Sequence, residues 1–489
     1  MQYIGIDFGT TNTSVVWVND DEYGRKITFL GENGEYPFSS IVAIPKSGGK
    51  LLFGREVRDQ RLALSETYEV HTSMKSFLGT SESFVVGEKR YYPKDITSAF
   101  LGYIKEYVKQ NYRDGNNNPI DITAASFAYP VDFSSEARRA LHDAANDAGI
   151  EVKAFVSEST AAYIANRAEG RAFSKVMVLD WGGGTIDISI LRLTGTSIHE
   201  ISVWGDQIGG DDIDRELAER IHAKIASDSQ ISGGRFDDMR PDERDQMIMR
   251  CEEAKITISV DGEDYPLTVR NYGTYGTKNT IITEEQFNGI VEPIIRARIL
   301  RAIDNALNKA GGLTPASIDG VIVVGGSSNL RLFEYAVTNL FKNARIIIPE
   351  KLQWSTAIGA ALMQIIGGNF RLSDMVGVKL SDDSIYEILP EGCVINKPID
   401  PITFSLTEDA LDARFIFTDS TGSSVYAKKS VPTKGFLKEE LVLSAIIRDD
   451  QIACITIANK NFSNVHNTTS VELNKLTFHY DISTLDESD

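Results

Sequence analysis

The sequence is poor in cysteine and contains no long apolar run. Its three cysteines, Cys251, Cys393 and Cys454, are far apart in 489 residues and show no metal-ligand spacing. This pattern excludes a disulfide framework and favours free thiols in a reducing compartment, so we expect a cytoplasmic protein. No stretch of about 18 apolar residues is present, so no transmembrane helix is expected. Asp7 interrupts the apolar N-terminal stretch and no basic segment precedes it, so no signal peptide is expected.

Positive charge is also scarce. The chain has 50 Lys and Arg against 69 Asp and Glu, a net charge of −19. Nonspecific binding to nucleic acid or to an anionic membrane needs a positive surface, so neither partner is expected. The 42% hydrophobic and 24% charged residues are ordinary for a globular protein that buries a core.

The common phosphate-binding motifs, GxxxxGK[ST] and a helix-opening GxGxxG, are absent, but another pattern occurs twice. Segments 4–16 and 177–189 each contain an apolar strand ending in Asp, then an aromatic residue, a Gly/Thr turn and a second strand. Backbone N–H groups in such turns can hold phosphate oxygens. The two strand-end carboxylates, Asp7 and Asp180, can hold a hydrated Mg²⁺. The repeat therefore predicts an ATP-binding clamp.

The order of elements predicts two units. Strands and helices alternate through residues 1–370, with one long helix expected over 284–310 behind a Thr283 capping box. From about residue 375 the chain reads as short alternating strands with polar turns, including a hairpin whose turn is Arg448 to Gln451. We expect a large α/β unit, 1–370, and a small all-β unit, 371–489; the sandwich-like form of the small unit is implied only by the resemblance described next.

These motifs resemble, in order and spacing, those of the seventy-kilodalton heat-shock chaperones, which belong to the actin-like ATPase superfamily. The resemblance covers 1–370 nearly continuously and implies a two-lobed actin-like ATPase domain with a duplicated core. The β-rich unit resembles the family's substrate-binding sandwich more weakly, and no peptide-binding residue can be named in it. The matching segments are 4–14, 73–79, 129–138, 157–162, 179–189, 209–214, 252–259 and 321–327.

The resemblance implies roles for the charged residues. Asp7 and Asp180 orient Mg²⁺ through its waters, and Lys75 places a cation on the γ-phosphate. Glu158 orients the attacking water, as a carboxylate acceptor can. Asp187 holds a monovalent ion such as K⁺ or takes the proton from the water. The expected catalytic residues are Lys75, Glu158, Asp180, Thr185 and Asp187, and the expected metal residues are Asp7 and Asp180.

The resemblance also implies where ATP or ADP lies. Glu252, Lys255 and Ser259 are three and four residues apart and share one helix face, which could grip ribose and base. Without the surrounding motifs, an ordinary surface ion pair would explain that spacing better. The expected nucleotide-binding residues are Gly9, Thr10, Thr11, Asn12, Gly182, Gly183, Gly184, Thr185, Gly209, Gly210, Glu252, Lys255, Ser259, Gly325, Gly326, Ser327 and Asn329.

Three positions and one segment depart from the family pattern. Ser159 stands where Pro is usual, and Gln353 stands where Asp is usual. Asn329 replaces an Arg that packs on the base, which predicts weaker nucleotide affinity. Residues 372–375 keep only part of the interdomain linker, which puts coupling between ATP and peptide in question.

We therefore expect a short, lidless, monomeric chaperone-like ATPase that hydrolyses Mg-ATP slowly and binds unfolded peptide or protein. By resemblance, a J-domain co-chaperone and a nucleotide exchange factor are expected partners. Three alternatives remain open: a nucleotide sensor or docking protein with little hydrolysis, an actin-like filament former, and a small-molecule kinase of the same superfamily.

Overall fold

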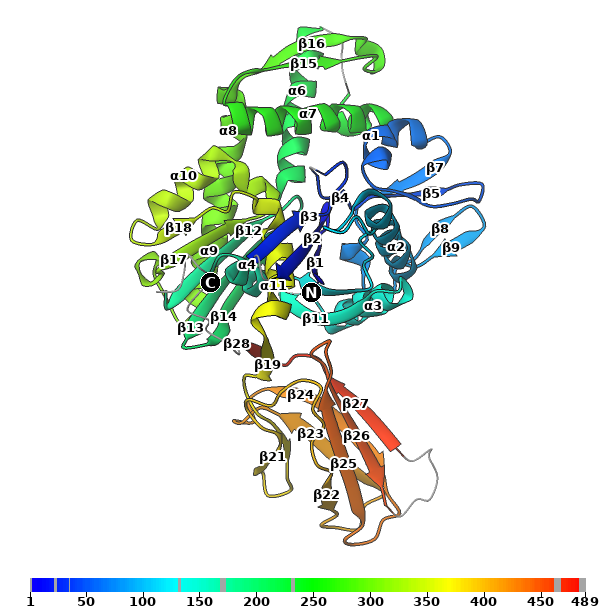
Figure 1. The fold of residues 1–489 in the computed structure, drawn as a ribbon, viewed down its shortest axis with the longest axis vertical. Helices are drawn as coiled ribbons and strands as arrows, with labels where there is room; N and C mark the ends of the chain where they lie inside the picture. Colours follow the sequence, from blue (N-terminus) through cyan, green and yellow to red (C-terminus); the bar gives the residue numbers. More distant parts are fainter. Residues whose placement is uncertain are drawn as a thin grey trace. The chain divides into compact units, whose positions relative to one another are not determined.

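A computed structural model describes residues 2–21, 24–34, 36–130, 133–167, 173–229, 234–460 and 468–482. The chain divides into two compact units (Figure 1). The first contains residues 1–132, 143–192 and 201–365. The second contains residues 133–142, 193–200 and 366–489.

Two sheets with one shared strand order organise the first unit. In each, a hairpin of two antiparallel strands is followed by two strands that join parallel to the first strand of the hairpin and to each other. This repetition confirms the expected α/β class with a duplicated core. One sheet runs β3 (Gly24–Phe29), β2 (Asn12–Asp21), β1 (Gln2–Phe8), β10 (Ala124–Tyr129) and β11 (Glu151–Ser157). The other runs β14 (Ser197–Asp206), β13 (Ile186–Thr194), β12 (Lys175–Trp181), β17 (Gly320–Val324) and β18 (Arg345–Ile347).

The apolar strands lie at the centre of these sheets. All five residues of β17 are buried, as expected for a parallel strand covered on both faces. Helix α2 (Pro93–Asn111) begins at Pro93, because proline suits the first helical position. The helices that the site uses are α1 (Arg55–Leu64), α4 (Glu158–Ala165), α6 (Gly210–Asp228), α7 (Pro241–Asp261) and α10 (Arg331–Leu340).

The predicted long helix over 284–310 is correct in extent but not in continuity. It consists of α8 (Glu284–Ile294), a π-helical segment (Ile295–Ile299) and α9 (Leu300–Lys309). Pro293 lies inside α8 and cannot donate a backbone hydrogen bond, which accounts for the change of helical register that follows. The capping box is present, with Thr283 Oγ1 accepting from the Gln286 N–H at 3.1 Å.

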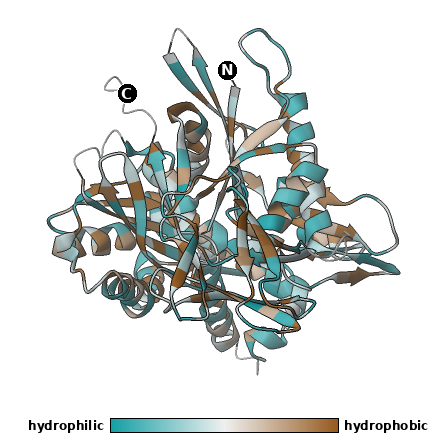
Figure 2. Cartoon of the chain, turned by 90° about the horizontal axis from the view of Figure 1, so that it is seen from below, coloured by the Kyte–Doolittle hydropathy of each residue, from teal (hydrophilic) through white to brown (hydrophobic). Residues whose placement is uncertain are grey.

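The second unit contains a β-sandwich of two four-stranded antiparallel sheets, as expected. Apolar residues alternate along the strands (Figure 2), and those facing inward, such as Phe417, Leu443 and Ile455, form one core. The expected hairpin joins β25 and β26 through residues 448–452. One sheet runs β21 (Ile385–Leu389), β20 (Val376–Lys379), β23 (Asp412–Thr418) and β24 (Val425–Pro432). The other runs β22 (Ile402–Ser405), β25 (Glu440–Ile447), β26 (Ala453–Asn459) and β27 (Thr468–Leu473).

One pairing was not foreseen from the sequence. Strand β28 (Phe478–Ile482) pairs with β19 (Gly368–Leu372) on one side and with residues 197–199 of β14 on the other. The chain therefore enters and leaves the sandwich on neighbouring antiparallel strands.

Within the described residues, no helix is long and apolar enough to cross a membrane. The three cysteines are free, and Cys251 is buried.

Candidate functional site

The turns of the two repeated hairpins face each other inside the first unit. A Cβ added at Gly183 would lie 2.3 Å from Thr11 Oγ1, and one at Gly184 would lie 4.0 Å from Thr10 Cγ2. At position 183, only glycine allows this approach of the second turn to the first. The structure thus brings together the two loops that the sequence analysis predicted to form a clamp.

The strand-end carboxylates lie deep in this clamp. Burial and then the negative charge of Glu158 raise the pKa of Asp7, and Lys75 lowers it, which leaves the pKa at about 7. Burial, followed by the charges of Glu158, Asp7 and Asp187, raises the pKa of Asp180 well above its usual value. Carboxylates crowded in this way favour a cation, and oxygen donors are the ligands that Mg²⁺ prefers. The pair therefore fits a divalent ion.

The geometry of the site does not favour direct coordination of a metal ion by several side chains. Among the residues with described positions, no group of three or more His, Cys, Asp or Glu is placed to hold a metal ion together. The predicted contact through metal-bound water remains a prediction.

Lys75 and Glu158 form a buried ion pair beside these carboxylates. Lys75 Nζ donates to Glu158 Oε1 at 2.8 Å, and the two residues are 8% and 7% exposed. Lys75 opens a short 3₁₀ turn, and Glu158 is the first residue of α4, next to the Ser157 cap. Burial lowers the pKa of Lys75, but Glu158 and then Asp7 and Asp187 raise it by more, so its net shift is upward. The lysine therefore remains a cation among acids.

The second turn adds hydroxyl and carboxylate oxygens. Asp187 lies directly opposite Asp180 across the β12–β13 hairpin. Thr185 Oγ1 donates to Asp187 Oδ2 at 3.1 Å. This places both predicted residues on the same side of the clamp as Asp180.

The loop before α6 closes over the second turn. Gly210 N–H donates to the Gly182 carbonyl at 3.2 Å, and Asp211 N–H donates to the Gly183 carbonyl at 2.8 Å. Ser327 Oγ donates to the same Gly182 carbonyl at 2.7 Å. The predicted glycines at 209–210 and 325–326 thus converge on the second turn, which is predicted to bind phosphate.

The predicted face of α7 lies next to that turn, and its charges are paired with other elements. Lys255 Nζ donates to Asp214 Oδ2 at 2.6 Å and to the Gly210 carbonyl at 3.0 Å. Glu252 pairs with Arg58 of α1. Glu252 and Lys255 therefore pair with residues of other elements and do not form the simple surface ion pair that was the alternative.

The buried partner of Lys255 is itself perturbed. Burial raises the pKa of Asp214 to about 7, although Lys255 lowers it. Its Oδ1 atom is buried and has no hydrogen-bond partner. This carboxylate is held by the lysine through one oxygen only.

The departures from the family pattern have structural consequences. Asn329 is exposed, and its Nδ2 turns back to donate to the Gly326 carbonyl at 3.0 Å. Gln353 contributes its backbone carbonyl, which accepts from Ser14 Oγ at 2.5 Å. Ser159 is buried in α4. In the segment 129–138, Val131 and Asp132 lie outside the described residues.

Sequence reasoning missed two arginines at this site. Arg58 reaches Glu252 and also donates to Asn12 Oδ1 at 3.4 Å. Arg331 lines a pocket with Ser259 and Leu330. Only the position of Arg331, two residues after Asn329, could have drawn attention to it.

The duplicated sheets and facing hairpins define an α/β chain of the two-lobed, actin-like kind. A family model described as "Hsp70 protein" matches residues 47–388, more than half of the chain. The chain belongs to the Hsp70 family.

Two curated relatives share the resemblance at modest identity. "Chaperone protein DnaK" of Mycoplasma mycoides subsp. mycoides SC is 29% identical over 366 residues, covering 73% of this chain and 58% of the relative. "Chaperone protein DnaK" of Mycoplasmoides gallisepticum is 28% identical over 392 residues, covering 78% and 62%. The matches thus span about three fifths of the length of these relatives.

Proposed function

We propose that this chain is a chaperone-like ATPase that binds Mg-ATP between its two lobes and hydrolyses it slowly. The observation that carries the proposal is the pair of facing hairpin turns, with Asp7, Asp180, Lys75 and Glu158 gathered at their base. A triphosphate needs backbone donors, a divalent ion and a cation at its far end, and this constellation supplies or fits each of them.

In the proposed reaction the protein acts by positioning and by charge. A bound Mg²⁺ supplies neutralisation of the phosphate charge. Lys75 leaves Glu158 to contact the γ-phosphate, and the freed Glu158 carboxylate accepts a hydrogen bond from the attacking water and so orients it. Asp187, beside Thr185, takes the proton of that water or holds a K⁺ ion. The N–H groups of the turns hold the remaining phosphate oxygens.

The β-sandwich is the proposed binder of unfolded peptide or protein, coupled to lobe closure. A J-domain protein and an exchange factor are the proposed regulators, and the working state is a monomer. Support for this part comes from family membership and from the names of the relatives, which are chaperone proteins.

A nucleotide sensor with little turnover is the second candidate. The observation that favours it is the closed Lys75–Glu158 pair, in which each proposed catalytic group neutralises the other. Asn329 also favours the sensor, because its short side chain cannot pack on a nucleotide base as an Arg would.

Single-turnover hydrolysis of ATP, with and without an unfolded peptide, tests the proposal. Peptide-stimulated turnover supports a chaperone, whereas tight binding with no turnover supports the sensor. Absence of any Mg-dependent ATP binding would overturn both candidates. Sedimentation with ATP tests the filament alternative, for which a pelleted polymer is the required result.

A further inference from the structure

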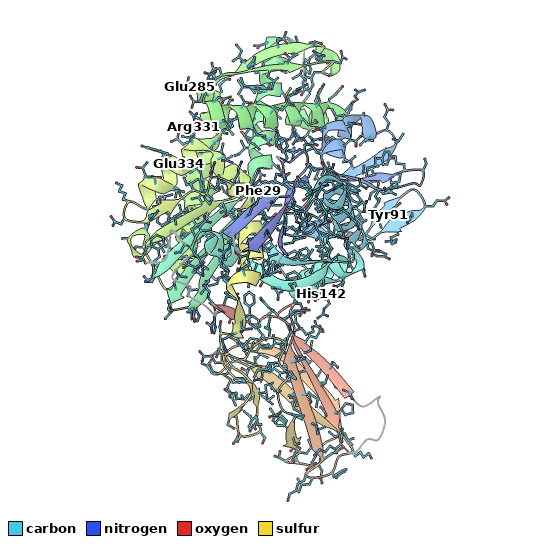
Figure 3. The ribbon with its side chains drawn as sticks, viewed as in Figure 1. Phe29, Tyr91, His142, Glu285, Arg331 and Glu334 are labelled. Carbon is cyan, nitrogen blue, oxygen red and sulfur yellow. The ribbon has the colours of Figure 1, made fainter. Side chains whose placement is uncertain are left out.

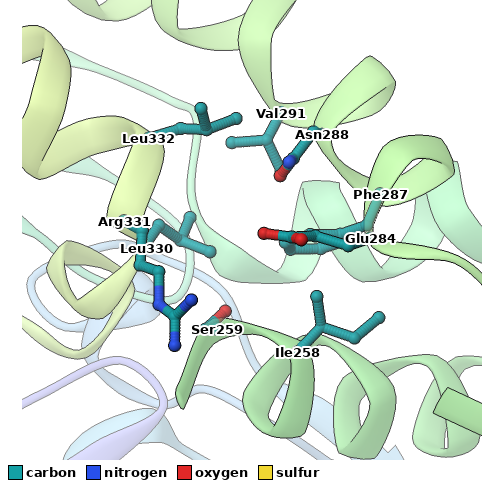
Figure 4. Close-up of a pocket in the computed structure, with 9 residues that line it drawn as sticks. All are labelled: Ile258, Ser259, Glu284, Phe287, Asn288, Val291, Leu330, Arg331 and Leu332. Carbon is teal, nitrogen blue, oxygen red and sulfur yellow. The ribbon is translucent and has the colours of Figure 1, made fainter. Parts of the chain in front are cut away.

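The π-helical segment between α8 and α9 shifts the buried side of this helical stretch by one residue. Phe287 and Val291 are buried on α8 and line a pocket between α8, α7 and α10 (Figure 4), whereas Glu285, labelled in Figure 3, is exposed on the same helix. A regular α-helix would continue the buried side at Arg298, two turns beyond Val291. The π-helical segment takes an extra residue into one turn, and Ile299 is buried instead. Arg298 is thereby left at the border of the buried side.

Arg298 lies against carboxylates at both ends of one loop. Its Nε donates to Asp206 Oδ2 at 2.8 Å and its Nη2 to Asp206 Oδ1 at 2.6 Å, the paired bonds that a guanidinium forms with a carboxylate. Nη2 also donates to the Gln207 carbonyl at 3.4 Å. The bonds to Asp206 raise the pKa of Arg298, with a smaller contribution from the charge of Asp212, and they lower the pKa of Asp206. The pair therefore stays charged at neutral pH.

The loop that Arg298 holds lies against the second hairpin at two points. At its start, a Cβ added at Gly205 would lie 3.3 Å from Asp187 Oδ1. At its end, a Cβ added at Gly209 would lie 2.1 Å from the Gly183 carbonyl oxygen. The N–H groups of residues 210 and 211 then donate to the carbonyls of the second turn. A displacement of this loop would therefore disturb the turn that is predicted to bind phosphate.

We propose that Arg298 is a positioning residue: through Asp206 it holds the loop 206–211 against the second turn, and it thereby sets the affinity of the site for the phosphate groups of the nucleotide. The inference rests on the proposed nucleotide binding. The π-helical segment presents Arg298 to the loop, and such segments are frequent at functional sites. The side chains of Arg298 and Asp206 are 45% and 27% exposed, so water screens the pair in part and a moderate effect is expected.

The test compares binding of ATP with binding of inorganic triphosphate, which has phosphates but no nucleoside. Arg298→Ala is expected to weaken the binding of both ligands by the same factor, about fivefold. Arg298→Lys keeps the charge without the paired bonds and should recover little of the loss. Arg296→Ala is the matched control, because Arg296 lies in the same π-helical segment and pairs with Glu292 on its own helix. This control should bind both ligands as wild type does.

A double-mutant cycle tests whether Arg298 acts through Asp206. Asp206→Asn keeps the size of the side chain and removes its charge, and it should cause the same loss as Arg298→Ala. The double variant should lose no more than either single variant, because each residue acts through the other. Thermal unfolding of each ligand-free variant identifies any loss caused by misfolding. If Arg298→Ala unfolds below wild type, Asp206→Asn gives the comparison.

The outcomes separate the two levels of the proposal. If wild-type protein binds neither ATP nor triphosphate, the proposed function fails and this inference fails with it. If wild-type protein binds both ligands and Arg298→Ala binds them equally well, the positioning role is wrong while the proposed function stands. Losses that add in the double variant, or a loss for ATP without one for triphosphate, would also overturn the role. Wild-type binding of ATP without any binding of triphosphate would count against a turn that the loop holds ready for phosphate.

Discussion

The two ends of the proposed nucleotide site are built differently. At the phosphate end the functional groups sit on strand ends and tight turns, and Lys75 and Glu158 are almost wholly buried with fixed partners. At the predicted base end the groups come from the C-terminal half of α7 and the turn before α10, and on α7 Ile256 is 54% exposed and Val260 is 65% exposed. Sheet register fixes the first end, whereas single side chains shape the second. The second end can therefore change with less effect on folding, and the Asn329 departure lies there.

The largest effect is expected from Lys75→Ala. We expect hydrolysis to fall at least about 100-fold while ATP affinity changes little, since the ammonium acts mainly on charge that develops in the transition state. Single-turnover kinetics and equilibrium binding check this. Lys342→Ala, at an exposed lysine, is the control and should hydrolyse ATP normally. Normal turnover in Lys75→Ala would remove that residue from the mechanism.

Asp180→Asn should change metal-dependent ATP binding and the stability of the ligand-free protein in opposite directions. The variant should lose about tenfold or more of the affinity that Mg²⁺ adds to ATP binding, because a carboxylate that accepts from the metal-bound waters becomes a neutral amide. Without ligand it should unfold at a higher denaturant concentration near neutral pH, because burial disfavours the wild-type carboxylate. Titration of ATP with and without Mg²⁺, and urea unfolding, measure the two effects. Unchanged Mg²⁺ dependence would contradict the metal role of Asp180.

Asp214 lies between the two ends and gives a pH test. Its pKa rises from 3.8 to about 7 on folding, so the folded state binds more protons than the unfolded state in that window. The free energy of unfolding should therefore fall as pH rises from about 4 to about 7, by at most about 1.4 kcal/mol per pH unit from this group. Asp214→Asn should flatten that slope, whereas Asp304→Asn, at an exposed position, should not. Equal slopes in wild type and Asp214→Asn would refute the buried titration.

The ion pair between Arg58 and Glu252 joins α1 of one lobe to α7 of the other. Both side chains are about one quarter exposed, so we expect Glu252→Gln to speed nucleotide release only about fivefold, and less at high salt. Stopped-flow release of a fluorescent ADP analogue measures this. Glu253→Gln, whose side chain pairs with Arg250 on the same helix, is the control. A Glu252→Gln variant with wild-type release would mean that the pair does not hold the lobes closed.

The smallest effect is expected from Asn329→Arg. A guanidinium at this position should tighten ATP binding by about threefold, because it can stack on the base where the short side chain of Asn329 cannot. Calorimetric titration of ATP measures the change. A gain far above threefold would show that the base end of the wild-type site is largely uncovered.

The phosphate end was more accessible to sequence reasoning than the base end, for a physical reason. Asp7 and Asp180 are each followed by glycines in a turn, and strand periodicity fixes where such a turn points. The Lys75–Glu158 pair joins residues 83 positions apart, and only the family resemblance connected them. The place of Arg331 depends on Gly262, in a segment with no motif of its own.

In the fold, too, some features could be predicted from the sequence and others could not. The large α/β unit and the small β unit followed from periodicity and turn residues, whereas the duplicated core and the sandwich were implied by the family resemblance. The break in the helix over 284–310 was missed because Pro293 was not weighed against the strong helical pattern around it. The pairing of β28 with β19 is a long-range contact between two five-residue strands, and such short segments carry no signal for their partner.

The pairing of β28 with β19 places the two ends of the sandwich segment side by side. Leu372 and Phe478 lie directly opposite each other in the antiparallel ladder, so everything between them is an excursion from one β-hairpin. Two opposed residues of this kind are what a two-residue turn normally joins. The loop that holds the sandwich could therefore be replaced by an Asn-Gly turn, or by another domain with closely spaced ends, while the ladder that closes it is kept.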